Sequence, residues 1–159
     1  MIRFLALALT LGLAAAPALA QETKAGDLVI VAPWARATPK GADVGAGYVE
    51  IRNAGAEPEQ LTGGSADFAK VEIHQMSMQG DVMQMREVQG GVAIPAHGAV
   101  KLAPGGYHLR FTGLKRPLAK GDTVKVTLTF AHAGAVAVDF PVRAIGAAAP
   151  GGDMKGMKM

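Results

Sequence analysis

Methionine is concentrated in two places in this chain of 159 residues, and the first of them lies beside a histidine. Met76, Met78, Met83 and Met85 fall within ten residues, shortly after His74, and the chain contains no cysteine. The last six residues hold the second group: Met154, Met157 and Met159. Thioether sulfur is a soft ligand that favours Cu(I), and neutral imidazole is a donor that copper accepts well. Together these residues predict a soft-metal site.

A β-hairpin centred on Gly80-Asp81 would bring these side chains together. The flanking segments, 71–76 and 82–88, have strand-like sequences, and glycine at the first central position suits a two-residue type II′ turn. In the resulting register the methionines face each other in pairs: Met78 with Met83, and Met76 with Met85. Directly opposed Cβ atoms lie roughly 4.5–5.5 Å apart, so these long side chains can converge on one ion.

Strand alternation predicts that the four methionines share one face of the hairpin with His74. Glu72 lies on the same face, which argues against deep burial there, whereas Val71 and Ile73 point the other way and are the predicted core pair. The alternative interpretation is that flexible methionines fill gaps in the core and that His74 is an ordinary histidine at its rim. The alternation favours the metal site.

The other three histidines have weaker patterns. His108 alternates with Tyr107 and Leu109, so it points away from the face that these residues bury. A histidine in this setting is more often a solvated polar residue than a ligand. His97 and His132 lie in short turns that contain glycine, and we assign neither a role.

The first twenty residues have the pattern of a secretion signal. Arg3 precedes an apolar run, and Ala18-Leu19-Ala20 is a small-x-small cleavage pattern, so the mature chain is expected to begin near Gln21. The apolar run is too short to be a convincing membrane span, and no later segment approaches that length. We therefore expect a periplasmic protein without stable membrane insertion.

Composition excludes several classes of protein. Removing the first 20 residues leaves 139, enough for one domain, and lowers the formal charge from +3 to +2. The remaining chain has no basic run that would suggest a nucleic-acid partner. Without cysteine there can be no disulfide, Cys-ligated zinc, Cys nucleophile or blue-copper centre. The chain has no G-x-S-x-G elbow, H-E-x-x-H motif or Gly-rich phosphate loop, so we do not expect an enzyme.

The fold is predicted by alternation of apolar and polar residues, with frequent Gly or Pro turns, across residues 27–145. The regular strands are 107–111, 124–130 and 136–142, and Tyr48 with Ile51 marks a less regular one. Short strands at this spacing are typical of an antiparallel β-sandwich or barrel. At most a single helical turn is expected, within 65–70.

Three parts of the chain are therefore expected. Residues 1–20 are the signal peptide, and 21–146 form one β-domain. Residues 147–159 are small, rich in Pro and Gly and then in Met and Lys, and cannot bury enough apolar surface to offset the entropy of ordering. We expect this last segment to be a disordered tail.

Several motifs resemble the PCu(A)C family of periplasmic copper chaperones, and the similarity covers about residues 27–143. The matching segments are Ala32-Pro33-Trp34-Ala35-Arg36-Ala37-Thr38-Pro39, Gly45-Ala46-Gly47-Tyr48, Val71-Glu72-Ile73-His74-Gln75-Met76, Val82-Met83-Gln84-Met85-Arg86, Pro104-Gly105-Gly106-Tyr107-His108-Leu109 and Gly113-Leu114-Lys115-Arg116-Pro117-Leu118. The resemblance implies a cupredoxin-like β-sandwich of Greek-key type. It also implies a Cu(I) site made of a His, a Met after ten intervening residues, and a distal His-x-Met.

Carried over residue by residue, the resemblance implies that His74, Met85 and His108 are ligands. The second Met of the family would fall at position 110, where this chain has Arg110. A cation there disfavours Cu(I) unless its guanidinium turns outward into solvent.

Three ways of completing the site remain open: a three-coordinate His-Met-His site, a sulfur from Met76 or Met83, or a thioether from the tail. We favour Met76 or plain three-coordination. Tails rich in methionine and histidine are associated in this family with additional copper binding. Because Met154, Met157 and Met159 are accompanied by no histidine, the tail suggests Cu(I) capture or relay, with a mobile solubilising end as the alternative.

The resemblance implies a chaperone that delivers Cu(I) to the copper centres of respiratory cytochrome oxidase. Its expected partners are the copper ion, the copper-site subunit of the oxidase and other copper-assembly factors, and the protein is expected to be a monomer. The alternative is an exported structural or adhesive β-sandwich without metal. That alternative predicts methionines that are buried against core neighbours.

Overall fold

The structure is a computed structural model, and it describes residues 21–148. The predicted signal peptide and most of the predicted tail, including its three methionines, lie outside the described residues. The described part consists of eleven strands: β1 (Glu22–Ala25), β2 (Leu28–Arg36), β3 (Val44–Asn53), β4 (Glu59–Ser65), β5 (Lys70–Gln79), β6 (Val82–Glu87), β7 (Val92–Ile94), β8 (Ala99–Leu102), β9 (Tyr107–Thr112), β10 (Thr123–Phe130) and β11 (Gly134–Arg143).

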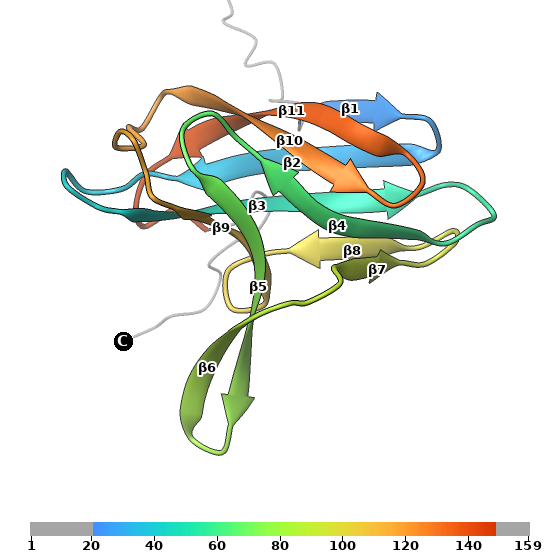
Figure 1. The fold of residues 1–159 in the computed structure, drawn as a ribbon, viewed down its shortest axis with the longest axis horizontal. Helices are drawn as coiled ribbons and strands as arrows, with labels where there is room; N and C mark the ends of the chain where they lie inside the picture. The colour runs from blue at the N-terminus through green and yellow to red at the C-terminus, as the bar shows by residue number, and fades with distance from the viewer. Residues whose placement is uncertain (1–20, 149–159) are drawn as a thin grey trace, which may run out of the picture.

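The strands follow one hydrogen-bonded path, in the order β6-β5-β9-β3-β2-β11-β10-β4-β7, with β1 beside β2 and β8 beside β3 (Figure 1). Every recorded pairing is antiparallel except that of β11 with β2, which joins the last strand to one of the first. Val142 pairs with Ala35, and Arg143 pairs with Arg36. The prediction of an all-β sandwich is confirmed.

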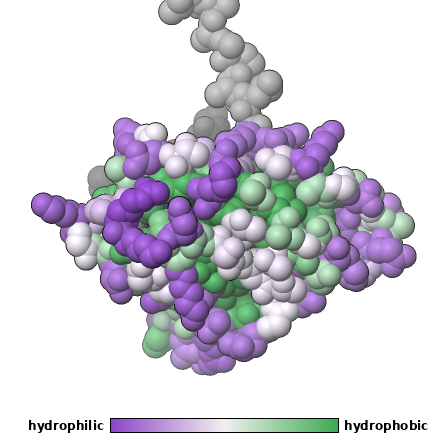
Figure 2. Space-filling view, turned by 45° about the horizontal axis from the view of Figure 1, so that its top comes forward, coloured by the Kyte–Doolittle hydropathy of each residue, from purple (hydrophilic) through white to green (hydrophobic). Residues whose placement is uncertain are grey.

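Alternating burial explains why these segments form strands. In β10, Val124, Val126, Leu128 and Phe130 are buried, and the residues between them face outward or are only partly covered. The opposing layers meet in one apolar cluster that includes Phe111. Figure 2 shows that the periphery of one face is mostly hydrophilic, while hydrophobic side chains are visible towards its middle.

The helical turn allowed within 65–70 does not form, and bends occupy Asp67–Ala69 instead. Phe68 is buried in the core, where its ring meets that of Phe111 edge to face at 5.3 Å. Its carbonyl accepts a hydrogen bond from the distant Lys115 amide at 2.9 Å. Because this segment is held by contacts with other parts of the fold, it forms no helical turn of its own.

The hairpin of β5 and β6 is the element that positions the candidate site. Its register is the predicted one, with Met76 opposite Met85 and Met78 opposite Met83. Gly80 has a φ of +62°, which glycine adopts without strain at the first central position of the turn. The outer part of the hairpin projects from the body of the domain (Figure 1).

None of the residues that the structure describes forms a helix long and apolar enough to cross a bilayer.

Candidate metal centre

Two histidines face each other across neighbouring strands. His74 of β5 is directly opposite His108 of β9, and the centroids of their rings are 6.0 Å apart. The sequence resemblance named both residues, and the structure brings them together. Their rings are therefore close enough to bind a shared ion if each presents an unprotonated nitrogen.

His74 has one such nitrogen. Its Nε2 lies 3.0 Å from Oε2 of Glu72, and because an ionised carboxylate only accepts hydrogen bonds, the proton of the neutral ring belongs on Nε2. Its Nδ1 is buried and has no hydrogen-bond partner. A buried polar atom without a partner is costly in a folded protein, and a metal ion is one of the groups that can satisfy it. The donor chemistry of His74 thus fits a soft cation.

Glu72 orients the His74 ring. Its second oxygen accepts from the ammonium of Lys70 at 2.6 Å. The hydrogen bonds from Lys70 and then from His74 hold the pKa of Glu72 below its ordinary value, although burial opposes them. Glu72 therefore stays ionised, and a carboxylate that holds the far nitrogen of a histidine is the usual outer partner of a metal-binding imidazole.

His108 is set up in a similar way by a backbone carbonyl. Its Nδ1 lies 3.2 Å from the carbonyl oxygen of Gly106, which can only accept, so the proton of the neutral ring belongs on Nδ1 and the lone pair on Nε2. Burial lowers the pKa of His108, and the charges of His74 and Arg110 lower it further, while the bond to Gly106 acts in the opposite direction. The ring is consequently held in its neutral, metal-binding form.

The expectation that His108 is a solvated strand residue is wrong, because only 6% of it is exposed. On the same side of the sheet Trp34 and Tyr48 stack with centroids 4.5 Å apart, and the guanidinium of Arg36 lies over both rings. Trp34 and Tyr48 are themselves buried, so a face that alternation alone suggested to be open is largely covered.

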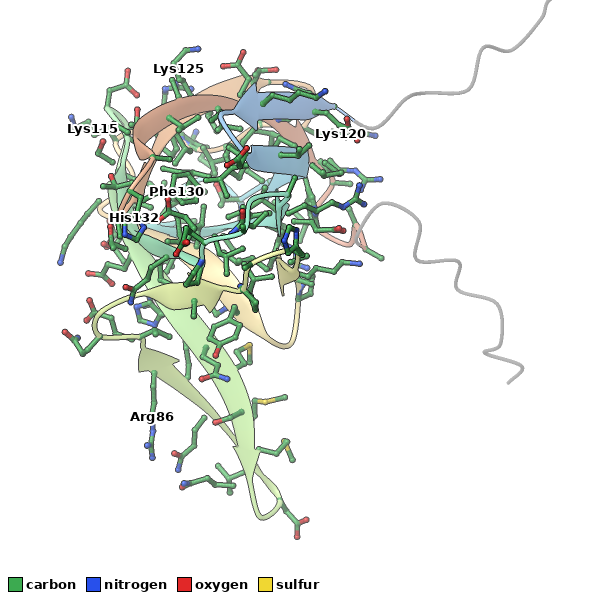
Figure 3. The ribbon with its side chains drawn as sticks, turned by 90° about the vertical axis from the view of Figure 1, so that its right-hand side faces the viewer. Arg86, Lys115, Lys120, Lys125, Phe130 and His132 are labelled. Carbon is green, nitrogen blue, oxygen red and sulfur yellow. The ribbon has the colours of Figure 1, made fainter. Side chains whose placement is uncertain are left out.

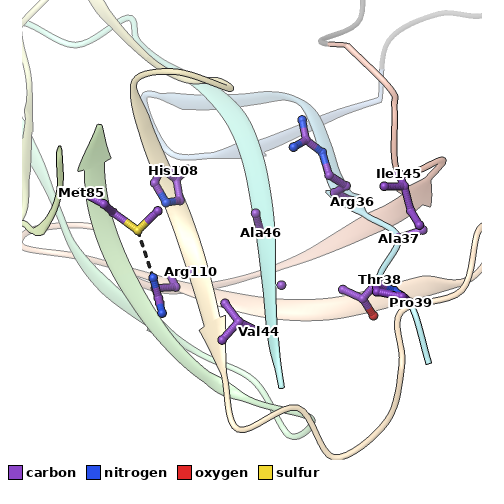
Figure 4. Close-up of a pocket in the computed structure, with 11 residues that line it drawn as sticks. Arg36, Ala37, Thr38, Pro39, Val44, Ala46, Met85, His108, Arg110 and Ile145 are labelled. Carbon is purple, nitrogen blue, oxygen red and sulfur yellow. Dashed lines mark hydrogen bonds between the residues drawn. The ribbon is translucent and has the colours of Figure 1, made fainter. Parts of the chain in front are cut away.

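Met85 is the sulfur nearest to the arginine that replaces the expected fourth ligand. Nη1 of Arg110 donates a hydrogen bond to Sδ of Met85 at 3.0 Å (Figure 4). Arg110 lies in the row of Glu72, and Met85 lies in the row of Met76. The row between these two holds His74 and His108, so the contact spans that row. The guanidinium of Arg110 thus points into the candidate site and not outward into solvent.

Met76 lies one row closer to the two histidines than Met78 and Met83 do. It is opposite Met85 on one side, and on the other side its amide donates to the carbonyl of Gly106 at 3.0 Å. Its side chain is partly buried, on the same face as His74. This position is compatible with a fourth donor.

The interpretation of the methionines as core filler is wrong. Met78, Met83 and Met85 are 58%, 50% and 44% exposed, and the buried core of the described residues contains no methionine. Val71 and Ile73 occupy the core face of the same strand, as predicted. The methionines therefore lie on the outer side of the sheet.

A shallow apolar pocket of about 280 Å³ lies beside His108. Met85, His108 and Arg110 line one side of it, and residues from the end of β2 and the start of β3 line the other, among them Arg36 and Val44 (Figure 4). The Nε of Arg36 is buried without a hydrogen-bond partner. The site thus opens onto a hollow with apolar walls and two cationic side chains.

The remaining histidines lie away from this site. His132 bonds Glu59 through its Nδ1 at 3.1 Å, and the backbone amides of His132 and Ala133 also donate to that carboxylate. His97 is exposed in a loop with a φ of +53°. Among residues 21–148 there is no group of three or more His, Cys, Asp and Glu able to hold a metal. The candidate site described here combines its two imidazoles with thioethers.

The sequence interpretation overlooked two orienting groups. Glu72 was used only as a sign that the face is polar, although it is two residues from His74 and alternation places the two on one face. Gly106 acts through its backbone carbonyl, which no residue pattern indicates. The first group could have been found from the spacing, and the second could not.

Comparison with known proteins adds to this geometry. A family model described as "Putative lipoprotein LpqE-like" matches residues 28–142. The chain belongs to the LpqE-like family. Over 111 residues it is 31% identical to a curated relative, "Putative lipoprotein Lxx21020" of Leifsonia xyli subsp. xyli, and the match covers 69% of this chain. The match spans 66% of that relative's own length.

Solved structures share the fold of this LpqE-like chain. The "Copper-bound PCuAC domain from PmoF2" is 29% identical and superimposes with a TM-score of 0.65, covering 78% of this chain and 98% of that domain. The solution structure of "CuI-DR1885" from Deinococcus radiodurans is 28% identical with a TM-score of 0.53, covering 70% and 74%. The LpqE-like chain thus has the cupredoxin-like sandwich of PCuAC domains, and both of these relatives are described with bound copper.

Proposed function

We propose that this protein is a PCu(A)C-type chaperone that binds one Cu(I) through His74, His108 and Met85, with Met76 as the fourth donor. The observation that carries the proposal is the arrangement of the imidazoles. The Nδ1 of His74 is buried without a partner, and hydrogen bonding directs the lone pair of His108 to Nε2. Two imidazole nitrogens and thioether sulfur form a donor set suited to Cu(I) and not to hard cations.

The position of the site suits a carrier and not an enzyme. Two paired strands, β5 and β9, hold the two rings, while the thioethers are long, flexible and partly exposed. A cargo ion can therefore enter and leave by exchanging one ligand at a time. The similarity to PCuAC domains with bound copper supports the same conclusion.

The exposed methionines disfavour the alternative of a structural or adhesive module. That alternative predicts methionines packed in the core, and three of the four hairpin methionines are at least 44% exposed. An exposed apolar face on a projecting hairpin has no evident stabilising role.

The proposed recipients are the copper-site subunit of a respiratory cytochrome oxidase and other copper-assembly factors, as the sequence resemblance implies. The proposed location is the periplasm, with the protein acting as a monomer. The twenty-residue signal pattern and the lipoprotein names of the family and its relative support export to the cell envelope. Mixing the Cu(I)-loaded protein anaerobically with a copper-free oxidase subunit domain should transfer the metal, measured as the copper content of the recipient after the two proteins are separated.

The copper site is tested by anaerobic competition for Cu(I) against a chromophoric chelator. His74→Ala and Met85→Leu should each weaken binding at least about tenfold, or ~1.4 kcal/mol. The matched control is His97→Asn. His97 is a loop histidine outside the site, and asparagine tolerates its left-handed backbone conformation. Unchanged affinity in both site variants would refute the assignment.

A further inference from the structure

The outer part of the β5–β6 hairpin has two chemically different faces. One face carries Met76, Met78, Met83 and Met85, and we call it the methionine face. The other face carries Val82 beside the turn and otherwise amide, hydroxyl and guanidinium groups: Gln75, Ser77, Gln79, Gln84 and Arg86. In Figure 3 the sulfur atoms of the hairpin lie on the opposite side of the ribbon from Arg86.

Because both faces of the projecting tip are exposed, burial in a core does not explain this segregation. Apolar packing would be served equally by valine or isoleucine, which are enriched in strands. The only group common to the four residues is the thioether, a soft donor on a flexible side chain. The methionine face therefore calls for an explanation in terms of sulfur.

The register arranges the donors in successive rows. The first row holds His74 and His108, the second Met76 and Met85, and the third, beside the turn, Met78 and Met83. Adjacent rows on one face are two residues apart, about 7 Å along the strand. Opposed Cβ atoms within a row are roughly 5 Å apart, so the sulfurs of one row, with one from the next, can meet on a single ion.

We propose that Met78 and Met83, with Met76, form a second Cu(I) site at the hairpin tip, which receives the ion and passes it inward to the imidazole site. This inference rests on the proposed Cu(I) cargo. The ion stays Cu(I) throughout: in each step one copper–sulfur or copper–nitrogen bond forms as another copper–sulfur bond breaks. Met76 is the shared ligand, because it is opposite Met85 and lies between His74 and Met78 on β5.

The tip site is the weaker of the two. It has only thioether donors and is largely exposed, with Met78 at 58% and Met83 at 50%, whereas the inner site adds two oriented imidazoles. A weak outer site and a tighter inner site give a downhill path for the ion, and the most exposed row is the first to meet a donor protein or chelate.

The test uses the full mature chain with ¹³C-labelled methionine methyl groups, titrated anaerobically with Cu(I). Met154, Met157 and Met159 are replaced by leucine so that the tail supplies no sulfur. The first equivalent should shift the Met85 methyl resonance, and the second should shift those of Met78 and Met83. In Met78→Leu/Met83→Leu the second event should vanish, while the affinity for the first ion stays within about twofold and uptake from a chelate slows several-fold.

The controls separate failure of the tip site from failure of the inner site. Val82→Leu changes an exposed residue on the other face of the tip and should leave both events intact. Two outcomes would overturn the tip site alone. One is that the double variant Met78→Leu/Met83→Leu still binds two ions. The other is that the methyl resonances of Met78 and Met83 do not shift through two equivalents of Cu(I). If His74→Ala leaves the first event unchanged, the inner site and the proposed function fail, whatever the tip does.

Discussion

The guanidinium of Arg110 donates a hydrogen bond to the sulfur of Met85 at 3.0 Å, and the contact passes over the two facing histidines. The sulfur of Met85, a ligand in the proposed site, is thereby engaged, and a positive charge stands beside it. If copper binds as proposed, it has to displace Arg110 from Met85. The same contact can return when the ion leaves, which favours release.

Replacing Arg110 should strengthen copper binding. Two unit charges about 5 Å apart repel by ~3 kcal/mol at an effective dielectric constant near 20, and by less where water screens them. We expect Arg110→Gln to raise the Cu(I) affinity about tenfold in chelator competition and to slow release to an acceptor chelate. Arg110→Met should exceed Arg110→Gln, because it adds a thioether. Equal affinities for the two variants would mean that another sulfur already completes the site.

Glu72 should influence binding without touching the ion. Glu72→Gln removes the charge that stabilises the Nε2–H tautomer of His74, so we expect a loss of about tenfold or more in Cu(I) affinity. Thermal unfolding of the metal-free protein should change little by comparison. Lys70→Gln is the control, since Lys70 is exposed and binds only the other oxygen of Glu72. A loss of equal size in Lys70→Gln would show that the ion pair as a whole matters, not the orientation of His74.

Counting the sulfur donors bound to copper tests whether Met76 is a ligand. X-ray absorption of the Cu(I) protein with one equivalent bound should fit two nitrogen and two sulfur donors, and Met76→Leu should lose one sulfur. Met83→Leu is the matched control one row further out, and it should keep both sulfurs. One sulfur in the parent protein would instead indicate a three-coordinate His-Met-His site.

The arrangement of the hairpin was predictable from its sequence because each determinant is local. Glycine at the turn fixed the register, and the two-residue period of strands fixed which side chains share a face. The strong alternation of β10 and β11 was informative for the same reason. By contrast, β4 was not predicted, because Gly63 and Gly64 interrupt its pattern. A Cβ at Gly64 would lie 2.9 Å from the carbonyl oxygen of Thr127 on the neighbouring strand, so its glycine reflects a tertiary contact.

The environment of His108 was not predictable for a related reason. His108 is buried beside His74 of a strand distant in sequence, and alternation says only that His108 and Leu109 point in opposite directions. The resemblance identified position 110 as a departure from the family pattern. Only the three-dimensional structure revealed that Arg110 bonds Met85 and does not turn away.

Glu59 should make stability depend on pH at the acidic side. Burial raises its pKa, but hydrogen bonds from the amides of Gln60, His132 and Ala133 and from the His132 ring outweigh this and hold the pKa below its ordinary value. The contribution of Glu59 to folding stability is therefore complete above the ordinary carboxyl pKa. It is lost as the pH falls through the lowered pKa of the folded protein. Glu59→Gln should reduce the free energy of unfolding at pH 7 by about 1–3 kcal/mol and flatten its acid dependence. An unchanged acid dependence would contradict this role.

Gly47 is required by the packing behind the site. A Cβ there would lie 2.7 Å from Cζ of Phe111, which is fully buried. Gly47→Ala should lower the free energy of unfolding by about 1–3 kcal/mol in denaturant titrations. At Gly63 a Cβ meets nothing within 4 Å, so Gly63→Ala is the control and should be nearly neutral. Equal stability of the two variants would show that the Phe111 ring can move aside.

The parallel pairing of β2 with β11 has a consequence for how the protein matures. Val142 and Arg143 must find Ala35 and Arg36, partners more than a hundred residues earlier in the chain. Long-range pairings of this kind make folding slow, on the order of milliseconds to seconds. The sheet cannot close until the last strand is available, whereas the register of the β5–β6 hairpin is set by its own turn. The local pairing that aligns the methionines can thus form, as a marginally stable hairpin, before the domain that carries it is complete.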